Sequence, residues 1–501
     1  MFLLSCRLLL KTTIKSQRRC YSQQPELASK RYNLTRGNYA SIRGSDINFF
    51  QSILGQTRVF TEECDVDGHN LDWYKAVKGS GKLLLKPKTA EEVSAILTYC
   101  NDTKLAVTPQ GGNTGVSGGA IPVFDEIILS TSQMNKIISF DEISGVLVCE
   151  AGCILDTLNE YLMEKNFIMP LDLGSKGSCN IGGNVSTNAG GLRVIRYGSL
   201  HGTVLGVEAV LANGTIMDCL SLMKKDNTGY DLKHLLIGSE GTLGVVTKVA
   251  IQCPVKPKSV QLALFGISNF SGVLETFKQA KQNLGEILSA CEYMDQTAIE
   301  SVVRNLNIRN PIGDFPFYMI IETSGSNEQH DEEKLNTFLE KIMADGVVQD
   351  GTVASDYTQI RSIWELRERI IEAQLLDGFV YLSDFSVPVN SFDRFVHDVQ
   401  NQVGDSGTVT GFGHLGDSNI HLHVISKEYT PELLSKIEPF VYEWTSKKRG
   451  SVSAEHGLGF KKKDYLSYSK SESVIDLMRN VKSIFDPNHI LNPYKVLPDK
   501  K

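Results

Sequence analysis

The sequence predicts an α+β protein with two domains. The chain has 501 residues, which is more than a single hydrophobic core usually serves. Between about residues 82 and 252, strand-like segments and amphipathic helical segments follow one another, and several connections are rich in glycine. From about residue 260 the glycine clusters end, and alternating strands are separated by longer helices. This change of pattern predicts a domain boundary near residue 257.

The first half is expected to contain short strands and three helices. A helix covers Asp46–Leu54, and the capping-box sequence Thr89-Ala90-Glu91-Glu92 begins a second helix that ends near Asp102. The remaining predicted elements are a helix over 154–165 and strands over 82–86, 106–109, 127–130, 146–149, 204–211 and 244–252. An Asn213-Gly214 turn predicts that the 204–211 strand begins a hairpin.

The second half is expected to alternate strands with amphipathic helices. The predicted strands are 262–265, 317–322, 381–387 and 420–425, and the predicted helices are 271–289, 331–344, 364–376, 431–449 and 472–485. Thr430 and Pro431 are typical of a helix N-terminus, with threonine as the cap and proline at the first helical position.

Composition excludes several classes of protein. The net charge is −7 and the pI is about 5.9, which argues against a nucleic-acid partner, because phosphate binding requires clustered Lys and Arg. The ten cysteines form no CxxC pair, so we expect reduced thiols rather than a disulfide framework or a zinc finger. No apolar run reaches the roughly 20 residues that span a bilayer.

Residues 1–25 predict a mitochondrial transit peptide. This segment contains five basic residues and no acidic one, and its leucines can share one helical face. A secretory signal is the alternative, but Arg7 interrupts the apolar stretch that such a signal needs. We therefore expect the protein in the mitochondrial matrix.

Four glycine-rich loops between residues 109 and 244 predict a binding site for an extended ligand. They are Pro109–Gly115, Gly177–Asn184, Asn188–Gly191 and Gly238–Gly244. Successive backbone N–H groups in such loops can surround an anion. One loop alone is more often a plain turn. The GxGxxG match at Gly411–Gly416 leads into a strand-like segment and has no helix after it, so it is no dinucleotide fingerprint.

The loop sequences PQGGNTG, GSCNIGGNVSTNAGG, YGSLHGTVLG and GSEGTLGVV resemble the FAD-binding domain of the vanillyl-alcohol-oxidase (PCMH-type) flavoproteins. The resemblance runs from about residue 30 to the C-terminus. It implies a FAD-binding domain over 26–257 and a substrate or cap domain over 258–498, whose final segment returns to the FAD domain. It also implies that the Pro109–Gly115 loop holds the FAD pyrophosphate. Asn113 stands where covalent flavoproteins often carry histidine, so we expect FAD bound without a covalent link.

The resemblance places FAD against the loop residues and a few others. These are Pro109, Gln110, Gly111, Gly112, Asn113, Thr114, Gly115, Gly177, Ser178, Gly182, Gly183, Asn184, Thr187, Asn188, Gly190, Gly191, Tyr197, Gly198, Glu240, Gly241, Gly244, Val245 and Asn492.

Histidines are concentrated near the C-terminus, where four of the ten lie within a short stretch. Two imidazoles and a carboxylate suit a divalent, zinc-like ion, although a single histidine is more often an ordinary core or surface residue. The resemblance implies a metal site made by His414, His421 and Glu455, and zinc is the expected ion.

The resemblance also implies the oxidation of a D-2-hydroxy acid, with D-2-hydroxyglutarate as the expected substrate. His456 would remove the hydroxyl proton while hydride leaves C2 for the flavin, and Arg367 would bind the substrate carboxylate. A helix-face ion pair with a neighbouring Glu is the alternative role for Arg367. We expect electron-transfer flavoprotein as the electron acceptor, and the chain could form a homodimer.

Three substrate-contact positions depart from the family pattern. Ile371 replaces a threonine, Leu382 a lysine and His423 an asparagine. His423 either donates a hydrogen bond to the substrate or joins the metal. These departures leave open the oxidation of D-lactate or another D-2-hydroxy acid, and a flavin-binding protein with little activity. A non-redox flavin enzyme that makes ether lipids is a further alternative, which the acidic balance does not favour.

Overall fold

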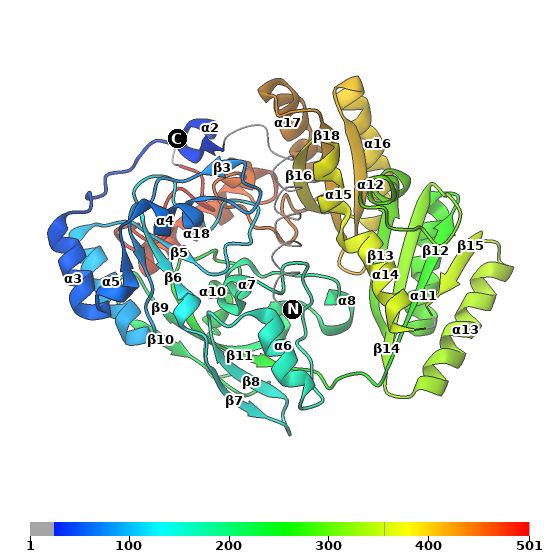
Figure 1. Cartoon of the computed structure of the whole chain (residues 1–501), viewed down its shortest axis with the longest axis horizontal. Coiled ribbons are helices and arrows are strands. Elements are labelled where there is room, and N and C mark those ends of the chain that lie inside the picture. The colour runs from blue at the N-terminus through cyan, green and yellow to red at the C-terminus, as the bar shows by residue number, and fades with distance from the viewer. Residues whose placement is uncertain (1–24, 355, 500–501) are drawn as a thin grey trace, which may run out of the picture.

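The computed structural model describes residues 25–354 and 356–499, which form two lobes side by side (Figure 1). The predicted α+β class is confirmed, since separate, largely antiparallel sheets are covered by helices. The predicted transit peptide lies outside the described residues except for Pro25. The described cysteines are free thiols.

The first lobe contains two main sheets. The first has four strands, in the order β2 (Val59–Phe60), β4 (Leu84–Leu85), β6 (Ile127–Ser130) and β5 (Val107–Gln110). The second is antiparallel and has five, in the order β10 (Ile216–Cys219), β9 (Val204–Val210), β11 (Val245–Gln252), β8 (Val146–Glu150) and β7 (Ile137–Asp141). The hairpin predicted at Asn213-Gly214 is confirmed, because it joins β9 to β10.

Short strands and helices complete this lobe. The strands β1 (Glu26–Leu27) and β3 (Val77–Lys78) pair with each other. The helices are α2 (Ala28–Arg31), α3 (Gly44–Leu54), α4 (Glu63–Asn70), α5 (Ala90–Thr103), α6 (Leu155–Met163), α7 (Ile181–Thr187), α8 (Val194–Tyr197), α9 (Leu200–Thr203), α10 (Lys233–Leu236) and α18 (Glu472–Phe485). The Thr89 hydroxyl accepts a hydrogen bond from Glu92 N at the start of α5, as the capping-box sequence predicts.

The second lobe is built on an antiparallel sheet of seven strands. Their order is β15 (Asp350–Val353), β12 (Ser259–Ile267), β14 (Phe317–Gly325), β13 (Leu288–Asp295), β17 (Thr408–His414), β18 (Asn419–Ser426) and β16 (Phe379–Ser386). Its helices are α11 (Phe270–Leu284), α12 (Gln296–Leu306), α13 (Glu328–Ala344), α14 (Tyr357–Glu368), α15 (Ile370–Asp377), α16 (Phe392–Val403) and α17 (Pro431–Lys447).

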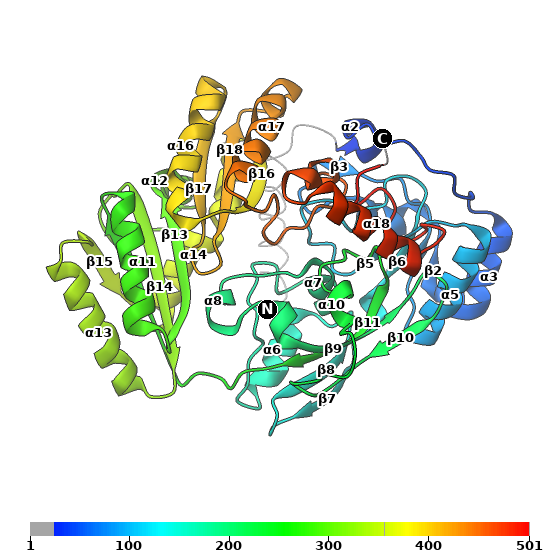
Figure 2. The ribbon, with the colours of Figure 1, turned by 180° about the vertical axis from the view of Figure 1, so that it is seen from behind.

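Helices cover both faces of this sheet. Successive side chains of a strand point to opposite faces, so the position of a residue in its strand tells which face it lies on. Helices α11, α13, α16 and α17 pack on one face, and α12, α14 and α15 pack on the other (Figures 1 and 2). On β13, Cys291 and Tyr293 face the first group of helices, whereas Ala290 and Met294 face the second. By the same alternation, Glu292 lies on the face toward α12, α14 and α15.

Three sequence-based predictions of local structure are wrong. The helix predicted over 271–289 ends at Leu284, and Leu288–Asp295 forms β13. Every residue of β13 is buried, so this strand shows no alternating pattern in the sequence. The helix predicted over 364–376 is two helices, because Arg369 leaves the helical conformation at φ −98° and ψ 13°. The glycine loop predicted over 177–184 becomes helix α7 from Ile181.

The C-terminal segment returns to the first lobe and pairs with β5. Val107 N donates to Ile490 O at 2.8 Å, and Asn492 N donates to Val107 O at 2.7 Å. Lys482 on α18 holds this segment in place: its buried Nζ donates to Thr242 O at 2.7 Å and to Leu491 O at 2.8 Å, and it pairs with Asp486. Lys482 thereby joins the last glycine loop to the end of the chain.

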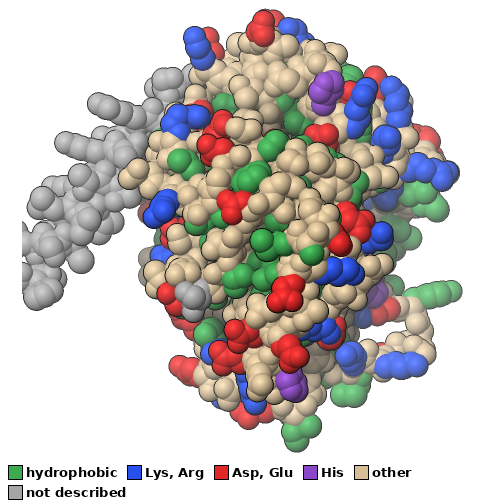
Figure 3. Space-filling view, turned by 90° about the vertical axis from the view of Figure 1, so that its right-hand side faces the viewer, with side chains coloured by type: hydrophobic (Ala, Val, Ile, Leu, Met, Phe, Trp, Pro, Cys, Tyr) green, Lys and Arg blue, Asp and Glu red, His purple; other side chains and the backbone are tan. Residues whose placement is uncertain are grey.

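The outer surface of the second lobe is ordinary in its charge distribution. Figure 3 shows acidic and basic side chains interspersed over this face. Within the described residues, no helix is both long enough and apolar enough to cross a membrane.

We predict that Lys482→Met lowers the melting temperature and weakens flavin retention. The substitution leaves the carboxylate of Asp486, which is 0% exposed, without its counter-charge, at an expected cost of about 3 kcal/mol. Thermal unfolding and flavin absorbance of the purified variant measure the two effects. The exposed Lys470→Met is the control. An unchanged melting temperature in Lys482→Met would refute the anchoring role.

Candidate active site

The glycine loops line a cleft in the first lobe. Of the predicted cofactor residues, those that line it are Pro109, Gln110, Gly111, Gly112, Asn113, Thr114, Gly115, Gly182, Gly183, Asn184, Thr187, Glu240, Gly241, Gly244 and Val245. Sequence reasoning did not identify Ser117, Gly119, Ala120, Thr131, Cys179, Asn180, Ser186 and Val246, which also line it. Most of them lie within a few positions of a predicted residue, so nearness to the loops was the available signal, but Thr131 follows β6 directly and is distant from every predicted loop.

The other predicted cofactor residues are not part of the wall of this cleft. They are Gly177, Ser178, Asn188, Gly190, Gly191, Tyr197, Gly198 and Asn492. Asn492 Nδ2 donates to Gly119 O at 2.8 Å and to Glu240 O at 2.6 Å, so it joins two segments of the cleft wall. Gly191 N donates to the Glu455 carboxylate at 2.9 Å, which places the third glycine loop beside the predicted metal ligand.

The cleft has the features that a dinucleotide cofactor requires. Gly112 lies so close to the second loop that a Cβ would be 2.1 Å from Ser178 O, so only glycine fits there. Three polar atoms at or beside the cleft are buried and have no hydrogen-bond partner in the described part of the chain: Asn180 Oδ1, Asn184 Oδ1 and Ser239 Oγ. Buried polar groups are normally paired, so these atoms indicate a polar ligand. The residues present therefore fit FAD.

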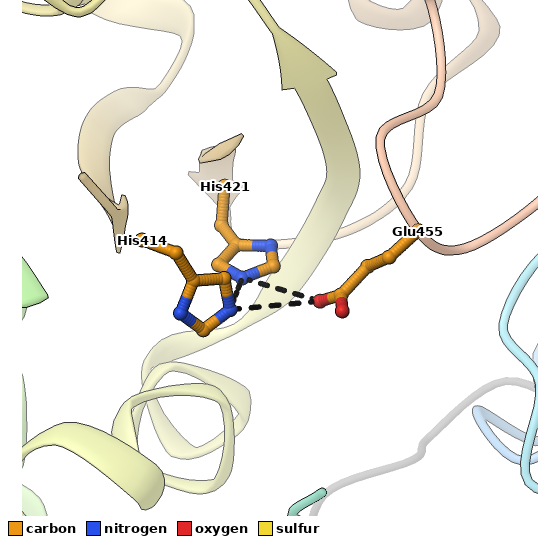
Figure 4. A group of neighbouring side chains, drawn as sticks. All are labelled: His414, His421 and Glu455. Carbon is orange, nitrogen blue, oxygen red and sulfur yellow. Dashed lines mark hydrogen bonds and ion pairs between the residues drawn. The ribbon is translucent and has the colours of Figure 1, made fainter. Parts of the chain in front are cut away.

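Two strands and one loop bring the predicted metal ligands together. His414 ends β17, His421 lies on β18, and Glu455 comes from the loop after α17; all three side chains converge (Figure 4). The two Nε2 atoms are 3.4 Å apart, and each lies 3.7 Å from Glu455 Oε1. Ligand atoms about 2.0 Å from a tetrahedral zinc ion lie about 3.3 Å from one another, so the triangle has nearly the required size.

The electrostatics of this trio favour a bound cation. Burial lowers the pKa of His414, but Glu292 and Glu455 raise it, and the net pKa is about 10. Burial and the neighbouring His414 lower the pKa of His421 well below its usual value. The two carboxylates thus stabilise positive charge beside His414, while His421 remains a neutral ligand, as metal binding requires.

Glu292 connects Arg367 to the group of His414, His421 and Glu455, which we call the metal trio. Its carboxylate, 0% exposed, accepts a hydrogen bond from His414 Nδ1 at 2.8 Å and one from Arg367 Nε at 2.8 Å. A carboxylate on the second nitrogen of a metal-ligating histidine is the usual arrangement that orients the ring. The predicted alternative for Arg367, an ion pair with a neighbouring Glu, is not what the structure shows, because Glu292 lies 75 positions away.

A second buried carboxylate, Asp384 on β16, holds the Glu455-His456 loop. It accepts backbone hydrogen bonds from Ala454, Glu455 and His456 at 2.7–3.0 Å, and it contacts Lys462 Nζ at 2.7 Å and His456 Nδ1 at 3.1 Å. Burial acts to raise the pKa of Asp384. The neighbouring His456 and Lys462 act in the opposite direction and more strongly, so the net pKa is well below its usual value. Burial lowers the pKa of His456 while Asp384 raises it, and the net pKa is raised. Sequence reasoning identified neither Glu292 nor Asp384.

Two of the three positions that depart from the family pattern are neighbours in the second-lobe sheet. Leu382 and His423 are cross-strand partners in β16 and β18, and Ile371 lies at the start of α15. His423 is outside the metal trio, and its Nδ1 lies 2.6 Å from Gln374 Oε1. Burial, followed by His456 and Arg367, lowers the pKa of His423 to about 3, so its ring is neutral.

Another cavity, with a volume of about 620 Å³, lies between the lobes. The charges of Arg193, Asp172 and Glu322 on its wall are paired with one another, since Arg193 bridges the two carboxylates. We assign the chemistry to the cleft and the trio, because His456 lines the cleft and its ring lies 5.6 Å from that of His421.

Comparisons with known proteins agree with this site. Residues 81–220 match the family described as "FAD binding domain", and residues 256–496 match "FAD linked oxidases, C-terminal domain". A mitochondrial D-2-hydroxyglutarate dehydrogenase of Danio rerio is 54% identical over 92% of this chain and 86% of that protein. A D-2-hydroxyglutarate–pyruvate transhydrogenase of Saccharomyces cerevisiae is 43% identical over 92% of this chain and 96% of its own.

The solved structure of p-cresol methylhydroxylase with bound substrate has the same fold, with a TM-score of 0.76 and 15% sequence identity, over 92% of this chain and 98% of that one. The predicted vanillyl-alcohol-oxidase-type fold and FAD as cofactor are thereby confirmed. The chain therefore belongs to the family of FAD-linked oxidases that includes the D-2-hydroxyglutarate dehydrogenases.

Proposed function

We propose that this protein oxidises D-2-hydroxyglutarate to 2-oxoglutarate in the mitochondrion. The observation that carries the proposal is the position of His456, which lines the glycine cleft and lies beside the metal trio. A single substrate carbon can therefore face the flavin site, the metal site and a base together. The names of the relatives support the substrate and the compartment, and the leader sequence supports the matrix.

Each residue in the site has a proposed task. FAD, when bound, would supply the hydride acceptor for C2, and a divalent ion, with zinc as the expected species, would polarise the C2 hydroxyl. His414, His421 and Glu455 would hold that ion. Asp384 occupies Nδ1 of His456, so Nε2 is the nitrogen that takes the hydroxyl proton.

Arg367 is proposed to bind a substrate carboxylate. Its Nη2 is buried without a hydrogen-bond partner in the described chain, while Glu292 fixes its Nε. A guanidinium fixed in this way offers a charge-assisted hydrogen bond in a chosen direction.

We also propose a role for each domain and an acceptor for the electrons. Residues 26–257 would hold FAD without a covalent link, and residues 258–498 would supply the substrate site. Electron-transfer flavoprotein would accept the electrons. A 2-oxo acid such as pyruvate is the alternative acceptor, since one relative is named for that reaction.

A second candidate is the oxidation of D-lactate or another D-2-hydroxy acid. Ile371 and Leu382 favour it, because neither side chain can hydrogen-bond to a second carboxylate.

We predict that anaerobic D-2-hydroxyglutarate bleaches the flavin absorbance, whereas the L isomer does not, and that removal of metal by a chelator abolishes the bleaching. Stopped-flow absorbance measures the rate for each substrate. His456→Ala, which lacks the proposed base, is the negative control and should lose at least 100-fold in rate. A faster reaction with D-lactate than with D-2-hydroxyglutarate would favour the second candidate. Bleaching at the wild-type rate in His456→Ala would refute the mechanism.

We predict that Asp384→Asn lowers kcat by 100-fold or more while flavin remains bound. The amide keeps the shape of the carboxylate but loses its charge, so Lys462 is left without a counter-charge and the ring of His456 is no longer fixed. Steady-state kinetics and flavin content of the purified variant test this. Asp398→Asn, on α16 at the opposite face of the sheet, is the matched control. A kcat within twofold of wild type would contradict the role of Asp384.

A further inference from the structure

His456 lines two cavities. One is the glycine cleft, and the other is a cavity of about 80 Å³ whose wall contains none of the predicted FAD residues. The second cavity follows β16, which is an edge strand of the seven-stranded sheet, so we call it the edge cavity. Because FAD is expected in the glycine cleft, a substrate needs another route to His456, and the edge cavity offers one.

The edge cavity lies where the two lobes meet. Residues 379–383 of β16 and part of α17 line it from the second lobe, and α2, Tyr74 and Ala76 line it from the first. The Tyr74 hydroxyl donates to Val380 O at 2.9 Å, which fixes the first lobe to the edge of the sheet. Both ribbon views place α2 beside α17 and β16 (Figures 1 and 2). Since a water molecule takes up about 30 Å³, only a small molecule can pass through a space of this size.

The wall of the edge cavity carries more cations than anions. Arg31, Lys461 and Lys462 line it, and Glu438 is the single acidic residue among the described residues that do so. Each of the two lysines pairs with a buried aspartate that is not part of the wall. Burial raises the pKa of Glu438, which favours its neutral form. Arg31 is therefore the cation on this wall that is left to attract an anion.

Aromatic rings rather than a carboxylate hold Arg31. Its guanidinium carbon lies 3.7 Å from the ring centroid of Tyr429 and 5.7 Å from that of Phe379. Nη1 donates to Ala76 O at 3.3 Å, whereas Nε is buried without a hydrogen-bond partner in the described chain, and Arg31 forms no ion pair with any described residue. Stacking on aromatic rings orients a guanidinium and leaves its charge available. Lys30, the neighbour of Arg31 on α2, is exposed, so this end of the cavity lies at the surface.

We propose that the edge cavity is the passage by which the anion of a 2-hydroxy acid reaches His456, and that Arg31 attracts the acid at the outer end of this passage. The proposal rests on the proposed function. Coulomb attraction is proportional to the charge of the ligand, so Arg31 favours the arrival of a dicarboxylate over that of a monocarboxylate. The passage thereby contributes to specificity before the substrate meets the metal trio.

Anaerobic stopped-flow bleaching of the flavin separates arrival from chemistry. The bimolecular rate constant reports the arrival of the substrate, and the limiting rate at saturating substrate reports the chemical step. At low salt, we expect Arg31→Met to lower the bimolecular rate constant about tenfold for D-2-hydroxyglutarate and about threefold for D-lactate, which carries half the charge. The limiting rate should stay within twofold of wild type.

The dependence on salt distinguishes attraction from a merely structural role. Raising the ionic strength from about 0.02 M to about 0.3 M should remove most of the difference between Arg31→Met and wild type, because salt screens the attraction. Arg31→Lys, which keeps the charge, should retain the salt dependence of the wild type. The matched control is Arg394→Met, which removes an exposed arginine on α16 and should change neither rate.

Two further substitutions test the route itself. Ala76→Leu narrows the wall and should lower the bimolecular rate constant by the same factor for both substrates, with an unchanged limiting rate. Glu438→Gln removes the opposing carboxylate and should raise that rate constant for D-2-hydroxyglutarate. If Arg31 served only to stabilise Glu438, Glu438→Gln would not raise it.

Several results would overturn the proposal. They are a loss in Arg31→Met that does not change with salt, a loss that is equal for the two substrates, and wild-type rate constants in both Arg31→Met and Ala76→Leu. If flavin content shows that Arg31→Met does not fold, Arg31→Gln supplies the same comparison. If D-2-hydroxyglutarate does not bleach the wild-type flavin, the proposed function fails. If it does bleach the flavin but the variants behave as wild type, only the assignment of the passage fails.

Discussion

The active site depends on the burial of Glu292. A carboxylate that is 0% exposed must be paired with hydrogen-bond donors, because an unpaired buried charge costs several kcal/mol. Glu292 satisfies this condition with two groups, His414 of the metal trio and Arg367 of the proposed carboxylate site. One charge therefore fixes His414 and Arg367 relative to each other, and with them the proposed metal and carboxylate sites. A change at His414 or at Arg367 therefore alters the surroundings of the other residue through Glu292.

The alternation of side chains along the strands places the residues of the site on one face of the second-lobe sheet. Glu292, Asp384, His414, His421 and His423 occupy β13, β16, β17 and β18, and the alternation directs them to the face covered by α12, α14 and α15. The opposite face of the same strands carries an apolar core. The loop from Ala454 to Gly459 closes the site, and it is held at one end by Asp384 and at the other by Glu240, which accepts hydrogen bonds from Leu458 N and Gly459 N. The flavin lobe and the cluster of His414, His421 and Glu455 are thus joined by buried carboxylates.

The features that could be predicted from the sequence are those that depend on short stretches of the chain. The glycine loops, the capped helix after Thr89 and the terminal helix at 472–485 depend on residues that are neighbours in the chain. The loop sequences led to the fold and to FAD, and the crowded histidines led to the proposed metal ligands. Glu292 and Asp384 could not be predicted in this way, because their partners lie 70 or more positions away. Glu292 also belongs to β13, a strand whose complete burial removes the alternating pattern.

Glu292→Gln tests the central claim most directly, with metal content and substrate KM measured on the same preparation. The amide has the size of the carboxylate but cannot neutralise both His414 and Arg367. Our account predicts that metal affinity falls about 10- to 100-fold and that the KM for D-2-hydroxyglutarate rises in the same variant. Glu300→Gln, on the surface of α12, should change neither quantity. A Glu292→Gln protein with wild-type metal content and wild-type KM, or with only one of them altered, would contradict the view that one buried charge organises both sites.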